Sequence, residues 1–296
     1  MAGTQLHPLI QKISDYYSAL TPKARILGDY ITENARKAVF MTTKELSEAC
    51  NVSEATVVRF VSQLGFHGYG EFQQILRDFV DTELTMLERL NFTDMKSPGS
   101  ERFRRVVSEE MDNLRQLFET MDMALVSEAV DLLLKSSHIY VIGSRLSYTL
   151  SYYMGWSLTK VRQNIHILKG SDRTTIDWLT IAPEDSLAVI IATTRYPNEL
   201  IRIGKLARRL DQKLLVITDS SACPLIQFAN TALIAPSRHI PYIGSPTTIS
   251  CLTNYLIQEL ASRRGEALIQ HQEKLELAYW ENDILFNLET EIPVKR

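Results

Sequence analysis

The sequence predicts a two-part chain, in which an all-α N-terminal domain precedes an α/β domain built on a doubly wound, five-stranded parallel sheet. Apolar residues of the first 92 positions recur only at helical spacing. From about residue 120, short Val- and Ile-rich runs alternate with helical stretches, which is typical of parallel strands buried on both faces. The length of 296 residues also exceeds that of one average domain.

In the N-terminal part, helices are predicted over 7–20, from Thr21-Pro22 onward, and over 43–50, 53–64 and 70–90. Thr is a good N-cap and Pro fits the first helical position, so Thr21-Pro22 marks a helix start. Its expected buried side chains are Ile26, Leu27, Tyr30 and Ile31. The turn residues at 91–100, with Pro98-Gly99, predict a linker there.

In the second part, strands are predicted at 138–142, 164–168, 187–192, 214–218 and 231–235. The predicted helices cover 124–135, 144–161, 198–210, 222–229, 246–263 and finally 266–288. The chain therefore divides into a helical domain (1–92), a linker and connecting helix (93–120), an α/β domain (121–265) and a C-terminal segment (266–296). That last segment is expected to be an oligomer contact, through Leu268, Leu275 and Tyr279.

Composition excludes several classes of protein. The net charge of 32 − 35 = −3 rules out a polybasic protein, although a local basic surface still suffices for DNA binding. The three cysteines are far apart and form no CxxC, so we expect no disulfide framework, no metal site and no cofactor. The start of the chain lacks a signal sequence, and no apolar run of about 18 residues occurs, so a cytoplasmic protein without membrane contact is expected.

Residues 43–65 have the pattern of a helix-turn-helix. Leu46 and Ala49 are expected to be buried in the first helix, Asn51 tolerates the left-handed turn, and Ser53 is a strong N-cap. In the second helix the apolar arc consists of Val57, Phe60, Val61 and Leu64, and the polar arc of Ala55, Thr56, Arg59, Ser62 and Gln63. A small polar face centred on Arg suits a major groove. The alternative is a small helical bundle, because residues 1–80 hold eight basic and eight acidic side chains.

The segment 20–72, with VSEATVVRF followed by LGF-x-GY-x-EF, resembles the N-terminal domain of the RpiR/MurR family of bacterial transcriptional regulators. Ser47 stands where the family usually has Ala, and Asn51 where it often has Gly. The resemblance implies DNA binding through the second helix, with His67 and Tyr69 near the phosphate backbone. The expected DNA-binding residues are Thr43, Lys44, Ser53, Thr56, Arg59, Gln63, His67 and Tyr69.

Polar loops follow three of the predicted strands, where ligands bind in doubly wound sheets. Hydroxyl groups and a helix N-terminus favour an anion there, although Ser and Thr are also routine N-caps. The candidate ligand-binding residues are Gly143, Ser144, Arg145 and Ser147 after the first strand, Thr193, Thr194, Arg195 and Glu199 after the third, and Ser220 after the fourth.

Residues 125–262 resemble the SIS (sugar isomerase) domain, which implies a phosphosugar ligand. Arg145 and Arg195 replace two glycines of its motifs, Ala192 replaces a Ser and Pro197 replaces a Thr. Guanidinium groups match carboxylates and phosphates, so one interpretation is a more acidic ligand, such as a sugar-acid phosphate. The other is that these arginines fill the pocket or pair with Glu199 or Asp219.

Together these patterns predict a ligand-responsive bacterial transcriptional regulator that binds double-stranded operator DNA and a small anionic sugar metabolite as a homodimer or homotetramer. We expect no catalytic residues. The alternative is a sugar-phosphate isomerase with an appended helical domain, for which Glu199, His239 and His271 are the conceivable general bases. Four aromatic residues are expected to be core or dimer contacts, namely Tyr152, Tyr153, Trp156 and Tyr255.

Overall fold

The computed structural model describes residues 8–39, 41–73, 75–76, 98–237 and 244–284. The N-terminal part is helical throughout its described residues, with α1 (Pro8–Tyr16), a short 3-10 turn (Tyr17–Ala19), α2 (Pro22–Ala38), α3 (Thr43–Ala49) and α4 (Glu54–Gln63). A further helix is described over 69–73 and 75–76, and the rest of the helix predicted at 70–90 lies outside the described residues.

These helices enclose a core of their own. Leu27 and Ile31 of α2 pack against Val57, Phe60 and Val61 of α4, and all five are fully buried. Two burial predictions were wrong, because Ile26 is 48% exposed and Ala49 is also exposed. Both belong to amphipathic helices in which a neighbouring residue takes the inward position. In α3 that residue is Cys50, at its C-cap.

The second part confirms the predicted doubly wound parallel sheet. Its strands are β1 (Ile139–Gly143), β2 (Ile165–Lys169), β3 (Leu187–Ala192), β4 (Lys213–Thr218) and β5 (Thr231–Ile234). They pair in parallel in the order β2-β1-β3-β4-β5. The chain therefore winds outward from β1 in one direction to β2 and in the other through β3, which creates a switch point between β1 and β3.

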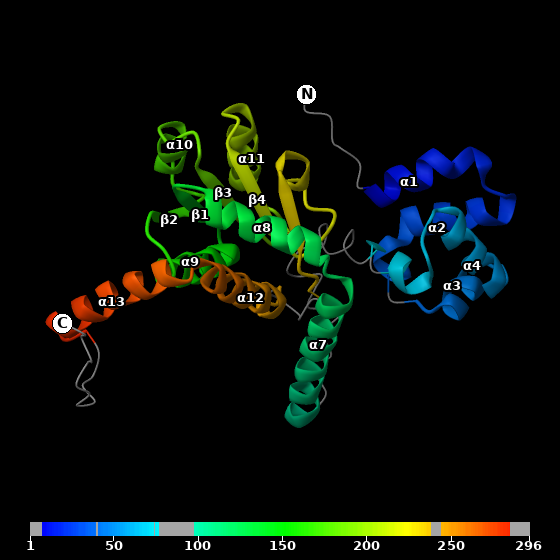
Figure 1. The fold of residues 1–296 in the computed structure, drawn as a ribbon. Helices are drawn as coiled ribbons and strands as arrows, with labels where there is room; N and C mark the ends of the chain where they lie inside the picture. The colour runs from blue at the N-terminus through cyan, green and yellow to red at the C-terminus, as the bar shows by residue number, and fades with distance from the viewer. Residues whose placement is uncertain (1–7, 40, 74, 77–97, 238–243, 285–296) are drawn as a thin grey trace.

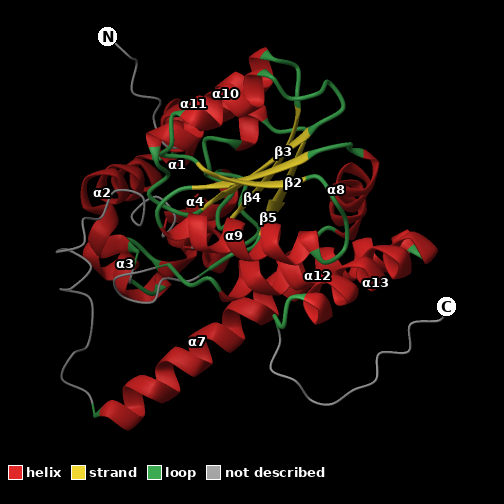
Figure 2. Cartoon of the chain, turned by 90° about the vertical axis from the view of Figure 1, so that its left-hand side faces the viewer, coloured by secondary structure: helices red, strands yellow, loops and turns green. Residues whose placement is uncertain are grey.

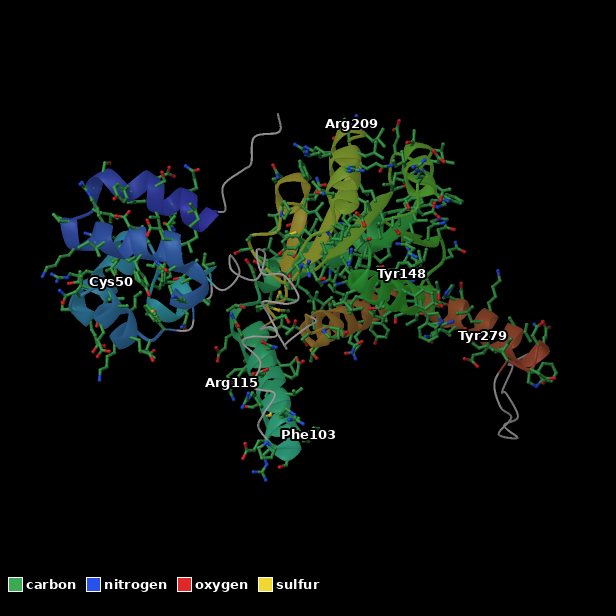
Figure 3. The ribbon with its side chains drawn as sticks, turned by 180° about the vertical axis from the view of Figure 1, so that it is seen from behind. Cys50, Phe103, Arg115, Tyr148, Arg209 and Tyr279 are labelled. Carbon is green, nitrogen blue, oxygen red and sulfur yellow. The ribbon has the colours of Figure 1, made fainter. Side chains whose placement is uncertain are left out.

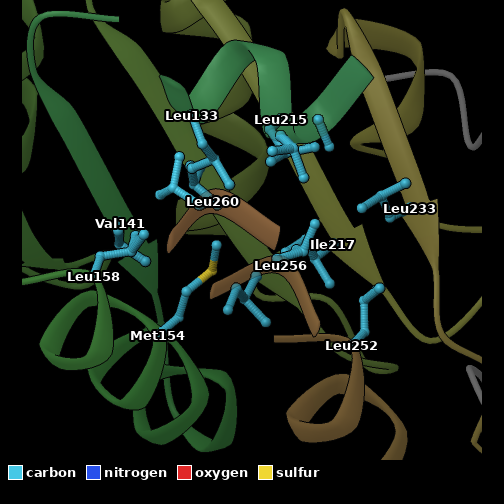
Figure 4. Packing of buried hydrophobic residues seen from close by; sticks show 14 of the residues in the cluster. Leu133, Val141, Met154, Leu158, Leu215, Ile217, Leu233, Leu252, Leu256 and Leu260 are labelled. Atoms are coloured by element: carbon cyan, nitrogen blue, oxygen red, sulfur yellow. The ribbon is translucent and has the colours of Figure 1, made fainter. Parts of the chain in front are cut away.

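Helices cover both faces of this sheet (Figures 1 and 2). On one face lie α8 (Met123–Lys135), α9 (Leu146–Thr159) and α12 (Thr247–Arg264). On the other face lie α10 (Thr174–Thr180) and α11 (Asn198–Arg209). Alternate strand residues supply the two cores, since Val141 and Ile217 face the α9–α12 side (Figure 4) while Ile142 and Val216 face the α10–α11 side.

Two long helices extend from this domain with little burial. In α7 (Gly99–Thr120) only Asn113 and Leu117 are buried, and in α13 (Glu266–Glu281) no residue is. Phe103, near the start of α7, lies far from the sheet, and Tyr279 marks the outer part of α13 (Figure 3). Among the described residues, no helix is both long and apolar enough to cross a membrane.

The element predictions differ from the structure in four places. A helix was expected over 222–229, but the structure has only the 3-10 turn Ile226–Phe228, because Pro224 lacks an N–H and disfavours a helical residue before it. The sequence reasoning missed α10, a seven-residue helix rich in β-branched residues. The last helix ends at Glu281 rather than at 288, and α7 begins at Gly99, inside the predicted linker.

Candidate functional site

The segment α3–turn–α4 has the local geometry of a helix-turn-helix. Thr42 and Glu45 form a capping box at the start of α3. Asn51 has a φ of 50° in the turn, as its left-handed tolerance predicted. Ser53 caps α4, since its hydroxyl accepts a hydrogen bond from the N–H of Thr56 at 3.3 Å. The capping box, the left-handed residue and the N-cap together set the direction in which α4 leaves the turn.

The outward face of α4 is polar and centred on one cation. Val57, Phe60, Val61 and Leu64 are fully buried, as predicted, whereas Ala55, Arg59, Ser62 and Gln63 are exposed. The Nε–H of Arg59 donates to the carbonyl of Ala55 at 3.2 Å, along its own helix. Lys44 and His67 are exposed beside this helix, and the hydroxyl of Thr43 donates to Glu54 at 3.1 Å.

Two of the predicted DNA-binding residues make hydrogen bonds within the helical domain. Thr56 is 9% exposed, and its hydroxyl lies 2.9 Å from that of Ser53 within the helix cap. The hydroxyl of Tyr69 donates to the carbonyl of Met41 at 2.7 Å, and burial raises the pKa of Tyr69 to about 12. Tyr69 therefore ties the residues after α4 to the loop before α3, and the DNA contacts expected of Thr56 and Tyr69 stay predictions.

In the second part, the candidate ligand loops meet at the carboxyl edge of the sheet. The loop after β1 is joined to the start of α11, because the Ser144 hydroxyl donates to Glu199 Oε1 at 2.6 Å. This hydrogen bond lowers the pKa of Glu199 below its usual range. The loop after β3 is joined to the end of β4 through Thr194 and Asp219. All of these loops lie at or beside the β1–β3 switch point, where doubly wound sheets bind ligands.

Asp219 accepts several hydrogen bonds at this edge and so holds the loops together, a role that sequence reasoning missed. Its carboxylate accepts from the N–H of Thr194 at 2.8 and 3.0 Å, from the Thr194 hydroxyl at 2.8 Å and from the Tyr196 hydroxyl at 3.3 Å. Burial raises the pKa of Asp219, and these donors oppose the shift. The available signal was its position directly after a buried strand, in Thr218-Asp219-Ser220.

Two of the candidate ligand-binding hydroxyls form hydrogen bonds within their own loops. Ser147 is 1% exposed, accepts from the N–H of Ser144 at 3.1 Å and donates to the Ser144 carbonyl at 2.9 Å. Ser220 is buried and accepts from the N–H of Ala222 at 3.1 Å. These groups shape the loops. Gly143 is required by the same close packing, because a Cβ there would lie 2.6 Å from the Ser151 hydroxyl oxygen.

Arg145 and Arg195 have backbone conformations that favour glycine. Arg145 has φ 54° and ψ −125°, and Arg195 has a φ of 69°, so a non-glycine residue is strained at each position. Both side chains are exposed. Neither guanidinium makes a hydrogen bond or an ion pair with any residue that the structure describes, and Glu199 and Asp219 have other partners. The positive charge of Arg145 nevertheless contributes, after the hydrogen bond from Ser144, to the lowered pKa of Glu199, so whether these arginines bind a ligand or serve the carboxylates stays a prediction.

The described residues contain no clustered metal ligands, and one conceivable base, His271, lies away from the candidate loops. No group of three or more His, Cys, Asp or Glu side chains within them is arranged to hold a metal ion. His271 lies on α13, where its Nε2 is 2.8 Å from the carbonyl of Thr159, away from the loops. His239 lies outside the described residues.

Known proteins share both parts of this architecture. The sequence matches the helix-turn-helix domain of the rpiR family over residues 7–82 and the SIS domain over residues 132–261. The HTH-type transcriptional regulator HexR of Pseudomonas aeruginosa is 24% identical over 273 residues, which span 90% of this chain and 94% of HexR. An uncharacterised HTH-type transcriptional regulator of Clostridium perfringens is 20% identical over 76% of this chain and 80% of its own length.

Solved structures share the fold. The Vibrio vulnificus NanR protein, complexed with ManNAc-6P, superposes with a TM-score of 0.58 at 19% identity, covering 94% of this chain and all of NanR. The sugar isomerase domain of an RpiR transcription factor from Sphaerobacter thermophilus has a TM-score of 0.56 at 21% identity, covering 58% of this chain and 97% of that domain. With a helix-turn-helix domain of the rpiR type joined to a SIS domain, this chain belongs to the RpiR family of transcriptional regulators.

Proposed function

We propose that α4 reads operator DNA and that the loops after β1 and β3 bind a small anionic sugar metabolite which controls that reading. The single observation that carries the proposed ligand site is the pair of exposed guanidinium groups of Arg145 and Arg195 on strained backbone at the switch point. A strained backbone persists where function needs the side chain, and guanidinium groups bind carboxylates and phosphates in a bidentate manner.

The proposal that α4 binds operator DNA rests on the outward face of this helix. Arg59 is exposed at its centre, and Ser62 and Gln63 follow it along the same face. Arg pairs with guanine in the major groove, and Gln pairs with adenine. Lys44 and His67, on either side of α4 in the chain, supply further exposed donors toward phosphates.

The effector class follows from the loops and from the relatives. NanR, which shares this fold, was solved with ManNAc-6P, so a phosphorylated sugar is the first class to test. The two arginines add positive charge where SIS motifs carry glycine. We therefore favour an effector with a second anionic group, such as a sugar-acid phosphate, over a neutral sugar.

We infer that the chain is not an isomerase. The relatives described above are named as transcriptional regulators. Isomerisation of a sugar phosphate needs a general base with a pKa near the working pH, whereas the hydrogen bond from Ser144 lowers the pKa of Glu199. Incubation of the full chain with aldose and ketose phosphates is expected to give no turnover, and steady interconversion would overturn this inference.

A thermal-shift screen of sugar phosphates and sugar acids on the full chain tests the proposed effector site. A true effector is expected to stabilise the fold by RT ln(1 + [L]/Kd), about 2.7 kcal/mol at a hundredfold excess over Kd. The double variant Arg145→Ala/Arg195→Ala should lose this stabilisation. Arg173→Ala is the matched control, since Arg173 is an exposed arginine after β2. An effector that shifts the double variant as much as the wild type would show that these loops are not the site.

A further inference from the structure

The outer side of α11 concentrates positive charge in a chain whose net charge is −3. We call this surface the α11 face, and its members are the exposed side chains of Arg202, Lys205, Arg208 and Arg209. At 100° per residue they fall within an arc of about 120°, opposite the buried Ile203 and Ala207. The last of them, Arg209, lies at the outer edge of the α/β domain (Figure 3).

The cations of the α11 face are not neutralised by their neighbours. None of the four forms an ion pair or a hydrogen bond through its side chain with a residue that the structure describes. The hydrogen bond from Ser144 is the main cause that lowers the pKa of Glu199, and the charge of Arg202 only adds to it. Elsewhere in the same domain an exposed cation is paired, as Lys135 is with Asp131 at 2.5 Å.

An ordinary solvated helix face explains only part of this pattern. Arg208 and Arg209 lie in the last turn of α11, where the helix dipole favours cations. Arg202 and Lys205 lie further inside the helix and gain no such stabilisation. Like charges three or four residues apart destabilise a helix, and the α11 face contains several such pairs. A local rule broken without compensation within the chain indicates a binding surface.

We propose that the α11 face binds the phosphate backbone of DNA beside the sequence that α4 contacts. This inference rests on the proposed DNA binding by α4 and adds a second surface to it. Contacts to phosphates supply a large share of the affinity for DNA, yet residues 1–80 hold eight basic and eight acidic side chains. The α11 face supplies the surplus of cations that the helical domain lacks, and contacts to phosphate require no recognition of bases.

DNA fits this surface better than an acidic protein does. The exposed residues of α11 are Asn198 and the four cations, so the face presents no apolar or aromatic anchor of the kind on which protein interfaces depend. Arg202 and Arg209 are seven residues apart, which places them about 10 Å apart along the helix axis. A row of cations of this length matches the repeating charge of a phosphate backbone.

The dependence of DNA affinity on salt tests the proposal, because its slope reports the number of phosphate contacts. Band-shift titrations over a series of salt concentrations would use a scrambled duplex of about four helical turns, roughly 40 bp. The variant Arg202→Gln/Lys205→Gln/Arg209→Gln should reduce the slope of log affinity against log salt by at least about 2, since each lost contact removes about 0.9. The ratio of affinities for the selected and the scrambled duplex should not change.

A matched control removes the same charge from other surfaces. The variant Arg115→Gln/Lys135→Gln/Lys274→Gln replaces exposed cations of α7, α8 and α13, and it should keep the wild-type slope. Gln is a good helix former, so both triple variants should keep the far-ultraviolet circular dichroism spectrum of the wild type. If the α11 variant had the same slope as this control, the α11 face would not contact DNA and the proposal would be overturned.

Two further outcomes are kept apart. If polyglutamate bound the wild type but not the α11 variant, while both had the same slope on DNA, an acidic protein would be the occupant and the proposal would fall. Failure of the proposed reading helix has a different signature, because Arg59→Ala tests it through the ratio of affinities for the selected and the scrambled duplex. The slope on the scrambled duplex does not depend on that ratio.

Discussion

At the scale of single residues, Arg59 is the side chain on which DNA recognition is expected to depend most. It is exposed at the centre of the polar face of α4 and makes no contact with another element that the structure describes. We expect Arg59→Ala to weaken binding to a duplex selected by the wild-type protein by about 1–3 kcal/mol. Band-shift titration at fixed salt measures this, and the melting temperature should hardly change.

The control for Arg59 is Lys23→Ala, which removes one exposed cation from α2. It should change the affinities for the selected and the scrambled duplex by the same factor, because a contact to phosphate carries no sequence information. If Arg59→Ala also left the ratio of the two affinities unchanged, α4 would not be the reading helix.

Arg145 is predicted to lower the free energy of unfolding and to strengthen binding of the effector. Its φ of 54° and ψ of −125° lie in a region that costs a non-glycine residue about 1–3 kcal/mol, while glycine adds unfolded-state entropy worth about 0.4–1 kcal/mol. Arg145→Gly should therefore raise the free energy of unfolding by about 1 kcal/mol and weaken the effector. Urea titration measures the first effect, and the thermal-shift screen measures the second.

Arg145→Ala separates strain from charge. It removes the guanidinium but retains a Cβ, so it should weaken the effector as much as Arg145→Gly without the gain in stability. Equal unfolding free energies for the Gly and Ala variants would mean that the backbone at Arg145 is not strained.

How far the sequence predicts side-chain roles depends on how local their interactions are. Ser53 and Asn51 were placed correctly, because a cap and a left-handed turn depend on residues within one helical turn. The bond between Thr56 and Ser53 was not predicted, since angular position on α4 does not reveal it. The role of Tyr69 depends on Met41, which lies 28 positions away, and no sequence pattern signals such a contact.

At the scale of elements, the cap of α4 makes a prediction that separates folding from recognition. Ser53→Ala removes the side-chain acceptor for the N–H of Thr56, which typically costs about 1 kcal/mol. Amide hydrogen exchange in α3 and α4 should then be about fivefold less protected, since 1 kcal/mol corresponds to that factor. Ser53→Asp should restore protection because Asp is an equally good N-cap.

The same aspartate is expected to impair DNA binding. Ser53 is exposed at the start of the recognition helix, so a carboxylate there would repel the phosphates of a bound duplex. A Ser53→Asp protein that is fully protected and binds the selected duplex as tightly as the wild type would place the DNA on another face of this domain.

The prediction of elements from sequence also had a clear limit. All five strands were recognised because parallel strands buried on both faces are continuous apolar runs. The helix α10 was missed, since seven residues with β-branched members carry weak helical periodicity. The sequence therefore predicted that loops after β1, β3 and β4 would meet at one edge, but not that their side chains would bond to one another, as the Ser144 hydroxyl does when it donates to the Glu199 carboxylate.

At the scale of the whole molecule, two copies are needed for selective DNA binding. One recognition helix contacts too few bases, whereas a two-fold dimer reads two half-sites about 10 bp apart or a multiple of this. An effector at the start of α9 then changes DNA affinity only by as much as it prefers one dimer geometry over another.

This coupling must be reciprocal, which gives the last prediction. If the effector changes the affinity for the selected duplex by some factor, the duplex must change the affinity for the effector by the same factor, typically about 5–150-fold. Band shifts with and without saturating effector give the first factor. Calorimetric titration of the effector into free and duplex-bound protein gives the second.

The double variant Arg145→Ala/Arg195→Ala should bind the duplex with unchanged affinity and show no response to the effector, because neither residue lies in the helix-turn-helix domain or on the α11 face. If that variant still responded, the effector would act elsewhere.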